Sequence, residues 1–597
     1  MVETLTIEKT KPQFGTSVSG YDWQFTPVDE RLALTLSQKY DLPEIVARIL
    51  AEKGIALDAV EPFLQPSLRT YLPDPHHLLD MEKAAVRLAD AVIKGERLAV
   101  FGDYDVDGAT SSALLKRFFA MLGNDVRIYI PDRIAEGYGP NAPAMQQLRA
   151  EGADIVITVD CGTVSYEPIK AANEAGLEVI VVDHHLGADA LPEALAVINP
   201  NRLDDTSPHG HMAAVGVSFL LVVAINRALR EKGFYQGKRE PDLLSLLDLV
   251  ALGTVCDVMQ LVGINRAYVA QGLKVLAKRR NIGLAALADV AGVHEAPGVY
   301  HLGFVLGPRI NAGGRVGEAS LGARLLSCED YEEARAIAER LNQFNLERKA
   351  IETMVQEDAV AQVEKQNMAE QPVIFAQGDG WHPGVIGIVA GRLKETYNRP
   401  VAVIALEGGV GKASARSISG VDLGAAITSA KAEGYLVAGG GHAMAAGFTV
   451  VAEKIPALHD FLNQRLAEDV KIYGARKTLD LQGVLSAAAA TPELIQSLAM
   501  LGPFGMGNPE PRFVLANAQL VRVDRVGENH LRCIVRDGRL ANGGATVTAM
   551  AFRCVDTPLG DILQASQGKR LHLAGKLRLN VWQGVESVQF LIDDVSC

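Results

Sequence analysis

Between residues 97 and 200 the chain alternates short, almost entirely apolar runs with longer stretches that have the composition of helices. The apolar runs are 98–103, 125–132, 153–160, 177–183 and 195–200. Strands that are apolar at nearly every position are typical of a parallel sheet with helices on both faces, because neither face meets water. We therefore predict an α/β fold with a parallel sheet for this part of the chain.

The rest of the chain has three further patterns. Residues 328–370 contain neither glycine nor proline and repeat apolar residues at helical spacing, which predicts one long helix or two helices end to end. A second α/β pattern follows Pro372 and ends near Val450. From about residue 478 the runs are short, β-rich and separated by glycines, which indicates a small all-β barrel such as an OB-fold.

These patterns divide the chain into five segments. We expect an N-terminal helical segment, a parallel-sheet domain, a long connecting helix, a second α/β domain and a C-terminal all-β, OB-like barrel. Their expected bounds are 1–75, 76–325, 326–371, 372–455 and 456–597.

Length and composition limit the class of protein. A chain of 597 residues is too long for one hydrophobic core and suggests about three or four domains. It has no run of eighteen or more uncharged apolar residues, and its N-terminus lacks the apolar core and cleavage site of a signal peptide. The six cysteines form no CxxC pair, which argues against a zinc ribbon or a disulfide scaffold and favours a reducing compartment. We therefore expect a cytoplasmic protein without a membrane segment.

Charge is unevenly distributed along the chain. The net charge of −13 argues against a general nucleic-acid coat, but it leaves room for a local basic groove. The C-terminal β region has six arginines from Arg512 to Arg539 and further basic residues at 569–578, with Trp582 and Phe590 nearby. Basic residues among aromatic ones on a small barrel are typical of single-strand binding. Arginines on a solvated β face are the alternative interpretation.

Aspartates follow the strands of the predicted parallel sheet. They are Asp103, Asp132, Asp160 and Asp183. Ligands of open parallel sheets bind beyond the carboxyl ends of the strands, so we expect these acids to face one crevice. Asp105 and Asp107 follow the first strand at a spacing of two, which points both the same way if the segment stays extended. Acids gathered in this way repel one another unless a cation neutralises them.

A pair of histidines, His184 and His185, directly follows Asp183. Carboxylates with imidazole suit Mn²⁺ or Mg²⁺, and the number of acids suggests two ions about 4 Å apart. Such a pair can activate water and stabilise the leaving oxygen in phosphoester hydrolysis. The alternative is that single aspartates only cap helices, as DVDGATSS at 105–112 could do. Four strand ends together with two histidines favour the metal site.

Two sets of motifs resemble known families. The first set is similar to the ordered motifs of the DHH phosphoesterase superfamily: DYDVDG at 103–108, VDCG at 159–162, VDHH at 182–185 and GTVCDVMQL at 253–261. The second set resembles the RecJ-type single-strand exonucleases within it: GPRINAGGR at 307–315, KASARS at 412–417 and GGGHAMAAGF at 439–448. The resemblance runs from about residue 70 to the C-terminus. It implies a DHH catalytic domain, a DHHA1 domain and an OB-fold, in this order.

The resemblance also implies roles for the matching residues. Its metal ligands correspond to Asp105, Asp107, Asp160, His184 and Asp257. Asp160 would bridge the two ions, Asp103 would complete the metal site, and His185 would contact the scissile phosphate. Only the resemblance selects Asp257, because it ends a helical run where an acid on the helix surface is the default expectation.

Several arginines lie in sequences that suggest shaped loops. Arg133 follows the second strand in PDRIAEGYG, and Arg309 and Arg315 lie among glycines that let the backbone approach a ligand closely. Ser414 and Arg416 lie in GKASARSISG. A guanidinium binds phosphate through two hydrogen bonds, although any one arginine alone is more simply explained as solvent-exposed. By resemblance, all of these except Arg309 would form a pocket for the DNA 5′ end, and Arg309 is a further substrate-binding candidate.

The glycine run in VAGGGHAMAAGFTV, at 437–450, lacks the GxGxxG register, which disfavours a dinucleotide site. We expect the glycines to form a tight turn that brings His442 and backbone amides near the substrate strand, as the DHHA1 domain does in the family. A purely structural turn is the alternative.

We therefore expect a metal-dependent exonuclease that degrades single-stranded DNA from 5′ to 3′ into mononucleotides, in DNA repair and recombination. Its cofactors would be two Mn²⁺ or Mg²⁺ ions. It would act as a monomer on strands with a free 5′ end, and the family implies a single-strand-binding protein and a DNA helicase as partners. The alternatives are a non-catalytic single-strand DNA-binding scaffold and a small-substrate DHH phosphatase or oligoribonuclease. The complete set of acids and histidines argues against the first, and the chain length argues against the second.

Overall fold

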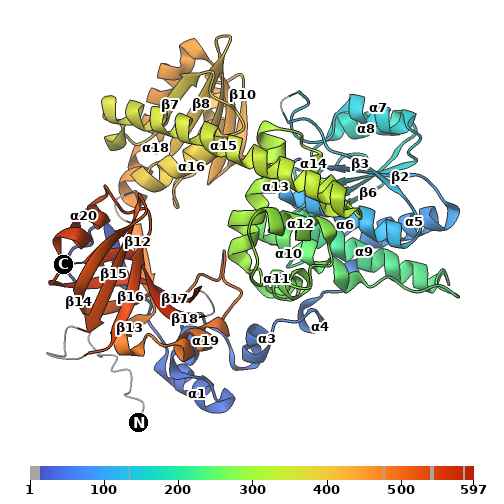
Figure 1. Cartoon of the computed structure of the whole chain (residues 1–597). Coiled ribbons are helices and arrows are strands. Elements are labelled where there is room, and N and C mark those ends of the chain that lie inside the picture. Colours follow the sequence, from blue (N-terminus) through green and yellow to red (C-terminus); the bar gives the residue numbers. More distant parts are fainter. Residues whose placement is uncertain (1–13, 134, 475–476, 538–543, 583–584, 597) are drawn as a thin grey trace.

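The computed structural model describes residues 14–133, 135–474, 477–537, 544–582 and 585–596 (Figure 1). These residues form a domain around a parallel sheet, a second α/β domain and a barrel domain, and the long helix α15 runs between the first two. None of the helices in this part of the chain combines the length and the apolar character that a membrane crossing requires.

The parallel sheet has five strands in the order β3-β2-β4-β5-β6, and every pairing is parallel. The strands are β3 (Val126–Tyr129), β2 (Leu98–Gly102), β4 (Ile155–Val159), β5 (Glu178–Val182) and β6 (Ala196–Ile198). Every residue of β2 and β4 is buried, which confirms the prediction of a sheet covered on both faces. The strand order reverses beside β2, so a crevice is expected at the carboxyl ends of β2 and β4.

Helices cover both faces of this sheet. One face packs against α7 (Ala142–Ala150) and α8 (Tyr166–Glu174). The other packs against α5 (Met81–Lys94), α6 (Val106–Met121) and α9 (Ala214–Glu231). The helical region that follows joins the second of these cores and comprises α10 (Leu247–Cys256), α11 (Gly263–Leu276), α12 (Ile282–Val290), the π-helix η4 (His301–Leu306), α13 (Gly307–Val316) and α14 (Leu321–Ser327).

The connecting segment is one continuous helix, α15 (Tyr331–Lys365). The carboxylate of Asp330 accepts a hydrogen bond from the amide of Glu333 and caps its start. Apolar residues of its first half pack into the core of the parallel-sheet domain, and those of its second half pack with β7 and α16 of the second domain. The same helix therefore fixes the two domains relative to each other.

The second domain has a mixed five-stranded sheet in the order β10-β11-β9-β8-β7. Its strands are β7 (Ile374–Asp379), β8 (Val401–Glu407), β9 (Val410–Arg416), β10 (Ala438–His442) and β11 (Ala445–Val451). Helix α16 (Ile386–Tyr397) lies with α15 on one face, and α17 (Leu423–Ala432) and α18 (Ile455–Tyr473) lie on the other. Because α18 packs into this core, the domain extends beyond the boundary at residue 455 that we expected.

The C-terminal domain is a closed barrel, as predicted. Its strands are β14 (Phe513–Val526), β15 (His530–Asp537), β16 (Thr546–Ala551), β18 (Val585–Ser596) and β17 (Arg570–Trp582), and β14 pairs with β17 to close it. The domain also contains β12 (Lys477–Leu481), β13 (Gly483–Leu485), α19 (Pro492–Ala499) and α20 (Pro558–Ala565). Phe590 is fully buried in the barrel core, so its ring is not available to bind a base, contrary to our expectation. The side chain of Trp582 lies outside the described residues.

The N-terminal segment packs against the barrel domain rather than standing alone. It comprises β1 (Tyr21–Phe25), α1 (Glu30–Tyr40), α2 (Glu44–Glu52), α3 (Val60–Leu64) and α4 (Leu68–Tyr71). Strand β1 pairs in parallel with β12, and apolar residues of α1 and α2 share one core with the barrel. Elsewhere in the described chain, short 3₁₀ helices lie at Leu57–Ala59, Pro75–His77, Leu243–Leu246, Met368–Glu370, Ala452–Lys454 and Ala487–Ala489.

Arg266 of α11 joins the parallel-sheet domain to the barrel domain. Its side chain is 1% exposed, and its guanidinium donates to the carbonyl of Leu501 at 2.8 Å and stacks 3.9 Å from the ring centre of Phe63. We expect Arg266→Ala to lower the free energy of unfolding by about 3 kcal/mol, because buried carbonyls lose a charged donor. Guanidinium-induced unfolding measures this. Arg324→Ala, at an exposed ion pair with Glu333, serves as control, and equal midpoints for both variants would contradict the prediction.

Candidate metal centre and phosphate-binding pocket

The carboxyl ends of β2, β4 and β5 bring together three groups of possible metal ligands. In each group the ligand atoms lie within 4.8 Å of one another. The groups are Asp103, Asp105 and Asp160; Asp160, His184 and His185; and Asp107, His184 and Asp257. Asp160 and His184 each belong to two groups, so the three form one continuous cluster. All of the metal ligands expected from the sequence lie in it.

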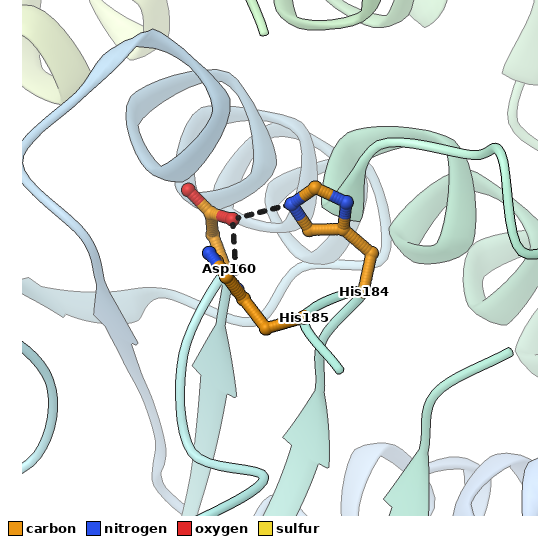
Figure 2. A group of neighbouring side chains, drawn as sticks. All are labelled: Asp160, His184 and His185. Carbon is orange, nitrogen blue, oxygen red and sulfur yellow. Dashed lines mark ion pairs between the residues drawn. The ribbon is translucent and has the colours of Figure 1, made fainter. Parts of the chain in front are cut away.

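Asp160 belongs to two of these groups, and its carboxylate faces the rings of both histidines (Figure 2). Its Oδ1 is 3.2 Å from Nε2 of His184 and 3.9 Å from Nδ1 of His185. Nε2 of His184 is also 3.5 Å from Oδ2 of Asp257 and 3.9 Å from Oδ2 of Asp107. The backbone of Asp160 has a φ of 61°, which residues other than glycine rarely adopt, and such strain is typical of functional sites.

Backbone amides from α6 and α9 hold Asp105 and Asp107 of the DYDVDG motif. Oδ1 of Asp105 accepts hydrogen bonds from the amides of Asp107 and Gly108, so Asp105 caps α6 and also belongs to a ligand group. The two oxygens of Asp107 accept from the amides of Ala214 at 2.7 Å and Val215 at 3.0 Å, at the start of α9. An aspartate such as Asp105 can therefore cap a helix and also belong to a ligand group, so the two interpretations of these acids do not exclude each other.

Asp257 reaches the cluster because α10 packs closely on α6. A Cβ at Gly253 would lie 2.9 Å from Oδ1 of Asp107 and 2.4 Å from Oγ1 of Thr110, so this approach requires glycine. Asp257 follows α10 and lies at the crevice. This helix contact explains why the sequence pattern alone did not select Asp257.

The other two strand-end acids have different roles from the ligands. Oδ1 of Asp183 accepts from the amide of His184 at 2.7 Å and lies 2.8 Å from Nδ1 of His185, so it orients both histidines. Asp132 is exposed, accepts from the amide of Ala135 and belongs to none of the ligand groups found among the described residues. Asp132 therefore does not join the other acids as a candidate ligand, because β3 ends at Tyr129 and Asp132 lies in the loop beyond.

Burial dominates the electrostatics of the cluster. It raises the pKa of Asp103 and Asp160 well above the usual range, and the charge of Asp105 adds to the effect. Burial and the charge of Asp105 raise the pKa of Asp107 to about 7, and burial and the charge of Asp107 raise the pKa of Asp257 to about 9. Each shift expresses the cost of placing negative charge in an enclosed site that already holds like charge.

Three carboxylate oxygens of the cluster are buried and accept no hydrogen bond from any residue that the structure describes. They are Oδ1 of Asp103, Oδ1 of Asp160 and Oδ2 of Asp257. Buried acceptors without donors are costly to a fold. Oxygen ligands with one or two imidazoles fit Mn²⁺ or Mg²⁺, so the residues present fit the expected ions.

The protonation state of the His184 ring also fits a metal site. Burial and the charge of His185 lower the pKa of His184 to about 4, so its ring is neutral near pH 7. A hydrogen bond to the backbone of Met212 helps to orient this ring. By contrast, burial lowers the pKa of His185, but the hydrogen bond to Asp183 and the charges of Asp183, Asp257 and Asp103 together outweigh burial and raise this pKa to about 9, so that ring is a cation.

A second polar site contains arginines from two domains. The guanidinium of Arg133 lies 4.9 Å from the ring centre of Tyr104, and Arg315 donates to the carbonyl of Gly384 at 2.9 Å. Burial, together with the charges of Arg133 and Arg348, lowers the pKa of Arg315 to about 10. Positive charges repel one another in an enclosed site, and a bound anion would offset this repulsion. The site is therefore suited to an anion.

Ser414 and Arg416 extend this site from β9. Alternate residues of β9 face opposite sides of the sheet, and these two face α16, where a Cβ at Gly387 would lie 2.9 Å from Oγ of Ser414. Nη1 of Arg416 donates to Oγ of Ser414 at 3.1 Å, and burial with the charge of Arg133 lowers the pKa of Arg416. The structure thus brings together all the residues expected to form the 5′-end pocket.

Arg309 and His442 share no hydrogen bond with the arginine cluster among the described residues. Arg309 donates to the carbonyl of Val305 at 2.7 Å and to Oδ1 of Asn342 at 3.0 Å. His442 is exposed at the end of β10, and the strand register places it level with Arg416, two strand spacings or roughly 10 Å away.

The glycines before His442 form strand β10, so the expected tight turn is wrong. The turn lies at Ala443 and Met444 instead. Glycine is needed in the strand for close packing, because a Cβ at Gly441 would lie 2.4 Å from the carbonyl oxygen of Ala445.

Sequence reasoning missed Tyr138 and His382. The hydroxyl of Tyr138 donates to the carbonyl of Asp160 at 3.1 Å and lies 3.3 Å from the ring nitrogens of His185. Burial and the charge of Arg133 lower the pKa of His382, which places its ring near the arginine site. The sequence GWHPG just after β7 is the signal that could have found His382, because it lies at the carboxyl end of a strand.

Comparison with known proteins identifies three matching family models. They are the DHH family N-terminal domain at 97–254, the DHHA1 domain at 370–468 and the RecJ OB domain at 481–594. The single-stranded-DNA-specific exonuclease RecJ of Escherichia coli (strain K12) is 36% identical over 567 residues, which cover 93% of this chain and 96% of that protein. The chain belongs to the RecJ family.

Solved RecJ structures have the same fold. The crystal structure of RecJ from Thermus thermophilus in complex with Mn²⁺ matches with a TM-score of 0.78 at 30% identity, over 96% of this chain and 79% of that one. The Mg²⁺ complex of the same protein matches with a TM-score of 0.73 at 28% identity, over 97% of this chain and 78% of that one. Both expected ions are thus found in RecJ crystals, in agreement with the donor set described above.

The repulsion among the crowded acids leads to a prediction for the free energy of unfolding of this RecJ-family chain. With chelator present, we expect Asp160→Asn to raise the free energy of unfolding by about 1 kcal/mol, because it removes one of several mutually repelling buried charges. We also expect the variant to lose the stabilisation that Mn²⁺ gives the unchanged protein. Thermal unfolding with chelator and with Mn²⁺ measures both effects.

Asp248→Asn provides the matched control, because Asp248 is also buried but lies at the other end of α10 from Asp257, outside the ligand groups. It should keep the stabilisation by Mn²⁺. An equal Mn²⁺ effect in Asp160→Asn and the unchanged protein would show that Asp160 holds no metal.

Proposed function

We propose that this protein is a metal-dependent exonuclease that degrades single-stranded DNA from 5′ to 3′ into mononucleotides, in DNA repair and recombination. The observation that carries the proposal is the presence of two complementary sites: an acid–histidine cluster that fits divalent cations and an arginine site that fits a phosphate. The RecJ relatives, which are named single-stranded-DNA-specific exonucleases, support it.

In this proposal the expected ligands would hold two Mn²⁺ or Mg²⁺ ions, and Asp160, which belongs to two of the ligand groups, would serve as a ligand common to both. When bound, the ions lower the pKa of a water and offset the negative charge that develops on the phosphate. His185 binds a non-bridging oxygen of the scissile phosphate through its ring. Its side chain is 43% exposed, it carries a positive charge, and its bond to Asp183 fixes its orientation.

The arginine site would hold the 5′-terminal phosphate. Arg133, Arg315 and Arg416 offer guanidinium groups that can bind two phosphate oxygens each, and Ser414 adds a hydroxyl. A terminal phosphate fixed there sets how far the first phosphodiester extends towards the metal centre. A fixed distance would account for both the direction of digestion and the release of one nucleotide at a time.

Arg309, His442 and exposed arginines of the barrel would bind the strand beyond its first nucleotides. The side chains of Arg522 and Arg532 are 65% and 47% exposed on the barrel surface. A monomer in the cytoplasm, supplied with single strands by a DNA helicase and a single-strand-binding protein, is the setting that we propose.

End-labelled substrates test the proposal. Single- and double-stranded DNA and RNA are incubated with Mn²⁺, with Mg²⁺ or with chelator, and the products are separated by size. We expect mononucleotides from the 5′ end of single-stranded DNA, with either ion and not with chelator. Binding without cleavage would favour the scaffold alternative, and hydrolysis restricted to dinucleotides or small phosphate esters would favour the small-substrate phosphatase.

A further inference from the structure

Two aromatic side chains are exposed on the parallel-sheet domain, beside each other. Tyr300 and Phe304 stack with ring centres 5.4 Å apart and an angle of 23° between the ring planes. They are 54% and 72% exposed, and no other large apolar side chain in the described part of the chain is as exposed as Phe304. An aromatic surface kept in water in this way is typical of a binding site.

The helix that carries Phe304 packs beside the metal centre. Phe304 is on the π-helix η4, a rare element that occurs frequently at functional sites. Helix η4 packs directly on the end of α10: a Cβ at Gly303 would lie 3.4 Å from Cγ1 of Val255, and one at Gly307 would lie 2.4 Å from Sγ of Cys256. The residue that follows Cys256, directly after α10, is the proposed metal ligand Asp257.

The other side of the pair faces the barrel domain. The guanidinium of Arg578, on β17, lies 5.8 Å from the ring centre of Tyr300. The side chain of Arg578 is 48% exposed, and its nearest carboxylate, on Glu510, is 3.9 Å away. The aromatic pair therefore lies between the metal centre and a basic residue of the barrel.

Further positive charge gathers between the same domains. Burial and the charges of Arg309 and Arg348 lower the pKa of Lys349, and Arg553 of the barrel domain contributes to the same shift. Arg553 follows Phe552, which is 54% exposed. Cations of helix α13, helix α15 and the barrel thus lie close enough to interact, and exposed rings occur on the same domains; cations and exposed rings together fit phosphates and unpaired bases.

We infer that Tyr300 and Phe304 form a base-stacking platform for single-stranded DNA, between the metal centre and the barrel. This inference rests on the proposed nuclease function and names residues that would select single strands. Bases stack on the two rings without regard to sequence, while Arg578 and Lys349 contact the phosphates on either side. A duplex cannot use the platform, because its bases already cover one another's faces.

Oligothymidylates with a 5′ phosphate, from two to twenty nucleotides long, test the inference in steady-state cleavage with Mn²⁺. We expect Tyr300→Leu/Phe304→Leu to raise the KM for the longest substrate about 5- to 50-fold, the range that loss of base stacking produces. The ratio of kcat/KM for the longest substrate to that for the dinucleotide should fall by a similar factor. Phe304→Trp should behave like the unchanged protein, because it keeps an aromatic ring.

Tyr331→Ala is the matched control, since Tyr331 is 49% exposed at the start of α15, and it should not change the length dependence. Direct binding is followed with 2-aminopurine placed at successive positions of a single strand bound to the Asp160→Ala variant. We expect quenching at one or two adjacent positions, and loss of that quenching in the added Phe304→Leu background.

Two results would overturn the inference. One is an unchanged length dependence in the double variant, and the other is equal behaviour of Phe304→Leu and Phe304→Trp, which would indicate an apolar contact with another kind of partner. Failure of the unchanged protein to cleave any length would instead contradict the proposed function. The 2-aminopurine measurement would still decide the platform in that case, because it requires binding alone.

Discussion

Asp160→Ala is expected to lower kcat for single-stranded DNA by roughly 10³-fold or more, while binding of the strand is retained. The carboxylate of Asp160 belongs to two of the three ligand groups, and its Oδ1 lies 3.2 Å from Nε2 of His184. Its removal therefore affects both proposed ion positions. The arginine site and the barrel should still bind DNA. Single-turnover cleavage of labelled oligonucleotides and fluorescence anisotropy measure the two properties separately.

The control for this experiment is Asp248→Asn. Asp248 is 2% exposed and accepts a hydrogen bond from the amide of Leu249, so it tests the loss of a buried carboxylate away from the ligand cluster. We expect it to keep most of the activity. Full activity of Asp160→Ala at saturating Mn²⁺ would refute the two-ion site.

Arg416→Ala is expected to reduce kcat/KM for 5′-phosphorylated strands about 10- to 100-fold, the effect of losing a charge-assisted contact to phosphate. Arg416 lies beside Ser414 and close enough to Arg133 for the two charges to interact. Strands with a 5′ hydroxyl should be affected little, so the variant should lose the preference for a 5′ phosphate. Competition between the two kinds of strand measures this preference.

Arg465→Ala serves as the matched control. Arg465 is an exposed residue of α18, which covers the opposite face of the same sheet. It should leave the preference for a 5′ phosphate unchanged. Equal losses for 5′-phosphorylated and 5′-hydroxyl strands in Arg416→Ala, or equal losses at 5′ and 3′ ends, would argue against a 5′-end pocket.

The sequence pattern predicted those parts of the fold in which buried positions recur regularly along the chain. The apolar runs before Asp103 and Asp160 identified β2 and β4, and the absence of glycine and proline identified α15. Pairings between distant segments leave no such pattern. Strand β1 pairs with β12, at the other end of the chain, and α18 packs in the second domain because of contacts that its own periodicity does not specify.

The candidate site was predictable to the extent that its residues follow strands or lie in recognisable motifs. The candidate ligand set follows from strand ends and from resemblance, whereas Asp132 shows that an acid expected at a strand end can lie outside the ligand groups when the strand stops early. Tyr138 and His382 were missed because their places in the site depend on tertiary contacts. The fold brings Tyr138 to Asp160, and the packing of the two domains brings His382 near Arg133. Strand β10, which ends at His442, forms because its glycines pack closely against β11. A run of glycines in the sequence does not show whether they form such a strand or a turn.

Anomalous diffraction from crystals grown with Mn²⁺, with data collected at the manganese edge, would locate the ions in the acid–histidine cluster. We expect two anomalous peaks about 4 Å apart at the carboxyl ends of β2 and β4, both within coordination distance of Asp160. A map without peaks at this position, with the carboxylates of Asp107, Asp160 and Asp257 turned away from one another into solvent, would contradict this expectation.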